Sequence, residues 1–331
     1  MTLPSKPGEK PKFSDSEEEI YFLKQVGRFT RSVSGNEGHG INIYLCKMKP
    51  DGSAKTELKE LWRDVRYPID TQAQSCWMDV NAKTKKIALS VTYAGSDLTG
   101  LWTMNLDGND LKRIITPERK QKSFQAIDSP SWTPDGQWIV FGESWRGEER
   151  GQIAKCDSQG KHFVYLTAGP ADGQPRVSPD GEQVLYVHNP MKKLGSDGAG
   201  ERWVAATLWI VDLKGSDNVE IPNPKARPDW PAKGQSGTYP AWSPDGKSIL
   251  LIAGDSEIID VASGRVIVDH RPMLQGDPHK GTCGWCQWGR GGFVGFTVGG
   301  ILFTDSELRE ARWIGSSKLV ECSGNRDSCR W

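Results

Sequence analysis

The sequence predicts an all-β fold, a six-bladed β-propeller in which each blade is a sheet of four antiparallel strands. Three observations lead to this prediction. The composition combines 37 Gly and 20 Pro with 14 Trp, which favours many short strands joined by turns. A Pro-Asp-Gly turn between two short strands recurs three times. Further apolar segments follow each recurrence, giving four strands per repeat of roughly 40–65 residues, a period typical of propeller blades.

The recurring turn lies in three nearly identical segments. They are SPSWTPDGQWIVF (129–141), QPRVSPDGEQVLYV (174–187) and YPAWSPDGKSILLI (239–252). Proline presets φ for the turn, while Asp and Gly adopt the conformations that reverse the chain. Degenerate copies at 74–91 and 284–298 fit the same frame. The tryptophans at the ends of the first strands are expected to pack between blades; they are Trp77, Trp132, Trp242, Trp288 and Trp331.

Counting these units along the chain gives the six blades. Their predicted ranges are 17–62, 74–117, 128–168, 173–222, 236–269 and 282–316. The first unit holds three strands, and the chain ends in DSCRW, which resembles the first strand of a repeat. We therefore expect residues 325–331 to pair with the N-terminal strands and close the ring. Residues 1–15 are polar and Pro-rich, so they are predicted to be a disordered lead-in to a single propeller domain over 16–331.

Charge and motifs exclude several classes of function. Lys and Arg number 42 and balance 42 Asp and Glu, which argues against a nucleic-acid binder. No apolar run approaches the roughly 18 residues that a transmembrane helix needs. A G-x-S-x-G nucleophile elbow is absent from the sequence, so a serine-peptidase reaction is not expected. No cofactor is predicted.

The W-[ST]-P-D-G and V-S-P-D-G repeats resemble the WD40-like propeller repeats of the TolB family, the periplasmic component of the Tol system. The resemblance extends from about residue 17 to residue 331. It implies a propeller that binds protein partners in the periplasm or elsewhere outside the cytoplasm, although the N-terminus as written has no apolar signal segment. The same repeats occur in peptidase propellers, in oligogalacturonate lyases and in subunits of larger complexes, so they indicate the fold rather than the activity.

Turn length distinguishes the two ends of the predicted blades. The first-to-second and third-to-fourth turns are tight, whereas the second-to-third loops and the blade connections are long. The long segments include 27–40, 142–151, 188–206, 223–238 and 270–282. Because loops on a rigid scaffold carry function, we predict that a partner or ligand binds this long-loop end over blades one to four. The candidate binding residues are of types enriched at hot spots or able to titrate; they are Trp145, Arg146, His188, Arg202, Trp203 and Trp230.

The predicted function is non-catalytic binding or scaffolding, with a protein partner expected and a small-molecule ligand left open. One alternative is a subunit of a multi-protein redox complex, because GTYPAWSPDG and GESWR resemble the propeller subunit of hydrazine synthase. Another is a propeller lyase or hydrolase with a site in the upper funnel. Clustering of His188 with His39, His270 or His279 would favour the enzyme. The histidines show no metal-ligand spacing, so metal binding stays open.

The seven cysteines leave at least one thiol unpaired within the chain. Cys322 and Cys329 flank the predicted closing turn, where a disulfide would lock the ring and imply an oxidising compartment. Free buried thiols are the alternative.

Overall fold

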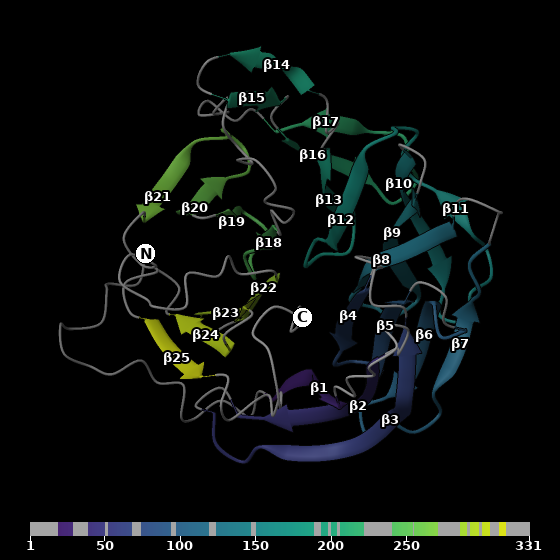
Figure 1. The fold of residues 1–331 in the computed structure, drawn as a ribbon. Helices are drawn as coiled ribbons and strands as arrows, with labels where there is room; N and C mark the ends of the chain where they lie inside the picture. Colours follow the sequence, from purple (N-terminus) through teal and green to yellow (C-terminus); the bar gives the residue numbers. More distant parts are fainter. Residues whose placement is uncertain are drawn as a thin grey trace.

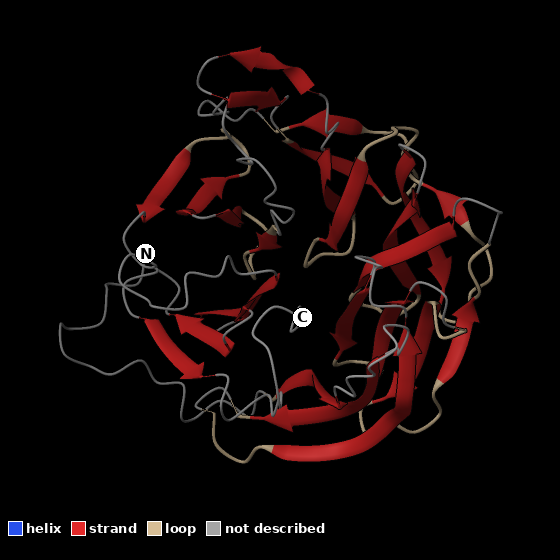
Figure 2. Ribbon diagram, in the orientation of Figure 1, coloured by secondary structure: helices blue, strands red, loops and turns tan. Residues whose placement is uncertain are grey.

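The computed structural model describes residues 19–28, 39–49, 52–67, 74–93, 97–118, 124–146, 150–188, 193–197, 200–203, 206–221, 240–253, 255–270, 285–289, 292–297, 300–304 and 311–315. All regular structure in these ranges is β-strand (Figure 2). None of them contains a helix long and apolar enough to cross a membrane. The predicted lead-in 1–15 and the predicted closing strand 325–331 lie outside the described residues.

The strands in these ranges form six antiparallel sheets, numbered here in chain order, and one added hairpin. The first sheet contains β1 (Ile20–Arg28), β2 (His39–Met48) and β3 (Thr56–Tyr67). The second contains β4 (Gln74–Asn81), β5 (Lys86–Tyr93), β6 (Gly100–Asn105) and β7 (Lys112–Ile115). The third contains β8 (Phe124–Trp132), β9 (Trp138–Arg146), β10 (Arg150–Asp157) and β11 (Val164–Tyr165).

The remaining sheets repeat the four-stranded pattern. The fourth contains β12 (Asp172–Val177), β13 (Gln183–His188), β16 (Thr207–Asp212) and β17 (Asn218–Glu220). The added hairpin, β14 (Lys193–Asp197) and β15 (Gly200–Trp203), lies in sequence between β13 and β16. The fifth contains β18 (Ala241–Trp242), β19 (Ser248–Ala253), β20 (Asp255–Asp260) and β21 (Val266–His270). The sixth contains β22 (Trp285–Gly289), β23 (Gly292–Thr297), β24 (Gly300–Thr304) and β25 (Ala311–Gly315).

The sheets follow one another around a common centre (Figure 1). In the four-stranded sheets the first strand lies nearest the centre, as β4, β8 and β12 do, and the last strand lies at the periphery, as β7, β11 and β21 do (Figure 1). The strand predictions for each unit are therefore confirmed in order and pairing, including the three strands of the first unit. Closure of the ring by 325–331 stays a prediction.

The hydrophobic core lies between neighbouring sheets. Ile43 and Leu45 of the first sheet pack with Ile87 of the second in one buried cluster. Further clusters join the second sheet to the third, the third to the fourth, and the fourth to the fifth. The second, third and fourth sheets thus bury both of their faces against neighbouring sheets, which is the packing that a propeller requires.

The three Pro-Asp-Gly turns have one shared geometry. In the turn of the fourth sheet, the Ser178 hydroxyl donates to Asp180 Oδ1 at 2.5 Å, and the same carboxylate oxygen accepts from the Glu182 backbone N–H at 3.0 Å. Gly181 has φ +81°, a conformation that glycine adopts without strain. The turns at 133–138 and 243–248 repeat these contacts. The prediction that these segments form turns that reverse the chain is confirmed for all three.

Two of the repeated tryptophans pack between sheets as predicted. Trp132 and Trp242 are 5% and 6% exposed and lie in the clusters that join the second sheet to the third and the fourth to the fifth. Trp77 does not share their position. Asn81 opens the turn of the second sheet as Thr133 opens that of the third, so Val80 is the counterpart of Trp132. The prediction that Trp77 occupies the position of the repeated tryptophan was wrong, because the turn of the second sheet, NAKTK, lacks the Pro-Asp-Gly residues that mark the register in the other sheets.

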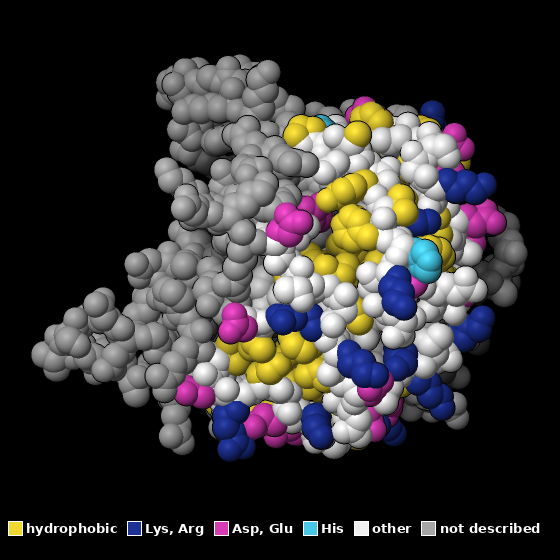
Figure 3. Space-filling model, turned by 90° about the vertical axis from the view of Figure 1, so that its right-hand side faces the viewer, with side chains coloured by type: hydrophobic (Ala, Val, Ile, Leu, Met, Phe, Trp, Pro, Cys, Tyr) yellow, Lys and Arg dark blue, Asp and Glu magenta, His cyan; other side chains and the backbone are white. Residues whose placement is uncertain are grey.

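The outer edges of the sheets expose several apolar side chains among charged ones (Figure 3). Tyr165 on β11 is 44% exposed and Val219 on β17 is 62% exposed. Both strands are very short, with two and three residues. Short outer strands offer little backbone to another sheet, which limits edge-to-edge association.

Candidate functional site

The second-to-third connections of the third and fourth sheets leave from one end of the molecule, which we call the long-loop end. Strand β9 finishes there with Trp145 and Arg146, and β13 finishes there with His188. The connection after β13 carries the added hairpin, with Arg202 and Trp203 on β15. Five of the six predicted binding residues therefore lie on strands at this end, and Trp230 lies outside the described residues.

The predicted loop over 142–151 is mostly strand. Trp145 pairs with Gln125 on one side and Arg150 on the other, so β8, β9 and β10 extend the third sheet up to a connection at 147–149. The predicted loop over 188–206 likewise contains the β14–β15 hairpin. Sequence reasoning missed these strands because Gly, Ser and charged residues are poor strand formers, and the ladder of neighbouring strands overrides that preference. The extra structure at this end is thus largely sheet.

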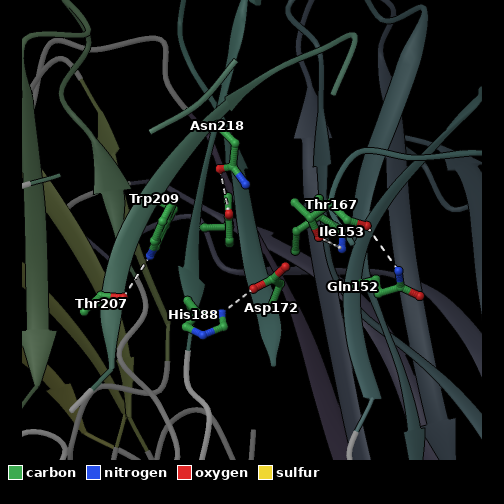
Figure 4. Close-up of polar contacts among 9 residues, drawn as sticks. Gln152, Ile153, Thr167, Asp172, His188, Thr207, Trp209 and Asn218 are labelled. Carbon is green, nitrogen blue, oxygen red and sulfur yellow. Dashed lines mark hydrogen bonds and ion pairs between the residues drawn. The ribbon is translucent and has the colours of Figure 1, made fainter. Parts of the chain in front are cut away.

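His188 is held by a carboxylate that the sequence did not single out. Its Nδ1 lies 2.7 Å from Asp172 Oδ1 on the neighbouring strand β12 (Figure 4). The Asp172 side chain is 3% exposed and that of His188 is 32% exposed. The edge of the imidazole also packs against Trp209, with ring centroids 6.3 Å apart. The pair fixes the ring orientation and leaves Nε2 as the nitrogen that remains for a ligand.

The backbone closes tightly around Asp172. A Cβ on Gly169 would lie 2.5 Å from Asp172 Oδ2, so only glycine allows the carboxylate to sit there. Gly151 N–H donates to the Pro170 carbonyl at 2.5 Å, which joins the third sheet to the segment that enters β12. The His188–Asp172 pair therefore stands on a junction between two sheets.

A set of buried and partly buried hydrogen bonds lies beside this junction (Figure 4). Thr167 Oγ1 accepts from the Ile153 backbone N–H at 3.0 Å, and the Thr167 carbonyl accepts from Gln152 Nε2 at 3.1 Å. Tyr186 donates to Asn218 Oδ1 at 2.8 Å. Burial, with a further contribution from the negative charge of Asp172, raises the pKa of Tyr186 to about 12, so the phenol stays protonated and acts as a donor.

Several predicted features are not tested by the described residues. His39 and His270 end or begin strands whose side chains there are not described, and His279 lies outside the described ranges, so clustering of the histidines is open. In the part of the chain that the structure describes, no three His, Cys, Asp or Glu side chains come together as metal ligands would. Cys46 and Cys156 are free thiols, while Cys322 and Cys329 lie outside the described residues.

The sequence held one indirect indication of Asp172. It lies in GPADGQPRV, directly before a repeat, where the chain enters an innermost strand. No local sequence motif links Asp172 to His188, because the two residues become neighbours only through the antiparallel pairing of β12 with β13.

Two known proteins are related to this chain in sequence. The Tol-Pal system protein TolB of Francisella tularensis is 27% identical over 41% of this chain and 38% of its own length. An uncharacterised protein of Agrobacterium fabrum is 26% identical over 49% of this chain and 50% of its own length. These relatives support a TolB-like β-propeller family for the chain. It spans only two fifths to one half of the length of these relatives, and no protein-family model matches it.

Solved structures agree at the level of fold. The crystal structure of a nidogen–laminin complex contains a chain that superposes with a TM-score of 0.54 over 88% of this chain and 94% of that chain, at 8% sequence identity. At that identity the similarity concerns the fold alone. Together with the radial order of the sheets, it supports the propeller architecture of this TolB-like chain.

Proposed function

We propose that this TolB-like chain is a non-catalytic binding or scaffolding propeller that holds a protein partner at its long-loop end. The observation that carries the proposal is the difference between the two ends of the sheets. The tight turns are built alike, with the same hydroxyl and carboxylate contacts in three sheets. The long-loop end carries an extended third sheet, an added hairpin and the His188–Asp172 pair.

Strand reversal does not require any of this added structure, so a binding role is its simplest explanation. The residues that it carries belong to types that dominate binding energy at protein interfaces, with Trp145 and Arg146 on one hairpin and Arg202 and Trp203 on another. A surface built on strands is also more rigid than one built on loops. Less conformational entropy is therefore lost when a partner binds.

The relatives suggest where such binding would occur. The matched relative in Francisella tularensis is named as a protein of the Tol-Pal system. By analogy we propose that this chain forms six blades closed by residues 325–331, works outside the cytoplasm and belongs to a protein assembly.

The proposal is tested by identifying the partner and then changing each end of the molecule. Size-exclusion chromatography of extract from the source cells, with identification of co-eluting chains, supplies the partner. Trp145→Ala with Arg146→Ala is then expected to weaken its binding by at least about 1 kcal/mol, close to fivefold. The matched control is Gln137→Ala with Lys247→Ala, two exposed positions in the tight turns. Binding that survives the first change but is lost with the second would contradict the proposal.

A further inference from the structure

The outer edge of the third sheet carries a run of exposed apolar side chains, which we call the third-sheet patch. Phe163, Val164 and Tyr165 are 38%, 44% and 44% exposed, and the last two form β11. In the part of the chain that the structure describes, they are three of the five large apolar side chains that are exposed, and they are consecutive. On this flank of the molecule, apolar side chains gather among side chains of both charges (Figure 3).

The neighbouring sheets do not repeat this run. The second, third and fourth sheets each enter the outermost strand from a turn that contains a glycine with positive φ, and the strands then form alike. Strand formation therefore does not require three consecutive apolar residues at this place. The third to fifth residues after the glycine are Leu111, Lys112 and Arg113 in the second sheet, Phe163, Val164 and Tyr165 in the third, and Asn218, Val219 and Glu220 in the fourth.

The patch is held in place by the sheet beneath it. The Phe163 ring packs edge-to-face on the buried ring of Phe141 with centroids 5.7 Å apart, and Tyr165 packs on Phe163 at 5.1 Å. The residue before the patch, His162, has φ +55°, and its Nδ1 lies 2.8 Å from Asp157 Oδ2. Because the rings and the entering turn are already ordered, docking on the patch loses little conformational entropy.

Charged side chains of both signs border the patch. Asp157 lies on one side with the exposed Lys161 in the same turn. This turn packs through Gly160 on β7 of the second sheet. On that sheet Lys112 Nζ lies 2.8 Å from Asp110 Oδ1, and both side chains are exposed. A border of one sign would repel a copy of itself, whereas this mixed border is complementary to its own copy.

Two further observations define the kind of association. Strand β11 has only two residues, so it offers almost no backbone edge for pairing with another strand, and docking must use side chains. The chain has 42 basic and 42 acidic residues, so two copies do not repel each other through net charge.

We propose that the third-sheet patch is a self-association surface on which a second copy of this chain docks with the same patch. A two-fold axis brings like surfaces together, which buries the aromatic rings of both copies and sets the cations of one border against the carboxylates of the other. The patch follows a tight turn and lies apart from the long-loop end, so this association is independent of the proposed protein partner. Because the patch is small, we expect a dissociation constant between about 1 µM and 1 mM.

Sedimentation velocity of the full chain over this concentration range tests the proposal. The wild type is expected to shift from monomer to dimer as the concentration rises. Val164→Asp places a charge in the patch and should raise the dissociation constant at least about tenfold. The matched control is Val219→Asp, at the equivalent position of the fourth sheet and 62% exposed, which should change the constant by less than about twofold. Far-UV circular dichroism checks that each variant is folded.

A mixture of two charged variants tests whether like patches meet. Val164→Lys should be as monomeric as Val164→Asp when each is alone. Mixed in equal amounts, they should form a dimer, because the opposite charges then lie in one interface. The proposal is overturned if the wild type stays monomeric over the whole range or if Val164→Asp and Val219→Asp behave alike. It is also overturned if the mixture does not associate, because the patch would then meet a different surface.

Discussion

Replacing Trp132 and Trp242 separately by Phe tests how the sheets are held together. The two side chains are almost equally buried, at 5% and 6% exposed, and occupy equivalent positions in the third and fifth sheets. They differ in one respect. Trp242 Nε1 donates to the Arg176 carbonyl of the preceding sheet, while Trp132 Nε1 has no partner among the described residues. The pair therefore isolates one hydrogen bond between sheets.

Both substitutions remove a similar volume. Phe is roughly 40 Å³ smaller than Trp, and at about 24 cal/mol per Å³ of residual cavity each change costs on the order of 1 kcal/mol. Trp242→Phe also removes the bond to Arg176, which adds about 1 kcal/mol and more if the carbonyl is left without a donor. Trp132→Phe removes an unpartnered N–H, so it adds no such cost. We expect Trp242→Phe to destabilise the protein more than Trp132→Phe by about 1–2 kcal/mol.

Urea unfolding followed by circular dichroism measures this difference. Equal m-values in the two variants would show that the change lies in the stability of the folded state and not in the surface exposed on unfolding. Equal losses of free energy in Trp132→Phe and Trp242→Phe would refute the claim that the indole–carbonyl bond joins the fourth sheet to the fifth.

Three further predictions concern the turns and the ring. Asn81→Ala should lower the free energy of unfolding in urea by about 2–3 kcal/mol, because Asn81 Oδ1 accepts from the Thr84 N–H and its Nδ2 donates to the Thr133 carbonyl of the next sheet. The control Asn109→Ala, at an exposed position, should lower it by less than about 1 kcal/mol. Equal losses in the two variants would count against the hydrogen-bonded link between the second and third sheets. The Ser178 hydroxyl and the Glu182 N–H lower the pKa of Asp180, so its ionised form stabilises the fold above about pH 4, and this stabilisation is lost as the pH falls through the folded pKa. The stability difference between wild type and Asp180→Asn should therefore become smaller as the pH is lowered below about 4. A difference that does not change with pH would contradict this prediction. Deleting 325–331 should expose the free edge of β1 and cause aggregation in sedimentation experiments, whereas a monomer of unchanged melting temperature would exclude closure by this segment.

The sequence was sufficient to predict the repeating architecture. The Pro-Asp-Gly turns have the same short-range contacts wherever they occur, because the hydroxyl, the carboxylate and the positive-φ glycine lie within a few residues of one another. Strand order followed from the alternation of turns and apolar segments. The second sheet was placed out of register at Trp77, since its turn uses Asn81 and Thr84 in place of the usual residues.

The features that distinguish individual sheets could not be predicted in the same way. The Asp172–His188 contact and the inter-sheet bonds of Asp79 and Ser131 join residues that are 16 to 53 positions apart. They depend on strand register and on the stacking of neighbouring sheets, which no local pattern encodes. The strands that carry Trp145 and Trp203 were likewise missed, because pairing with neighbours outweighs the weak strand preference of Gly- and charge-rich segments.

Site-specific photo-cross-linking tests most directly the claim that the long-loop end is the binding face. A photoreactive phenylalanine analogue is placed at Trp203, on the added hairpin, and in a second protein at Gln137, in a tight turn at the opposite end. Both proteins are irradiated with the partner that co-elutes with the native chain. We predict a cross-linked product from position 203 and none from position 137. A product from position 137 without one from position 203 would contradict a binding face at the long-loop end.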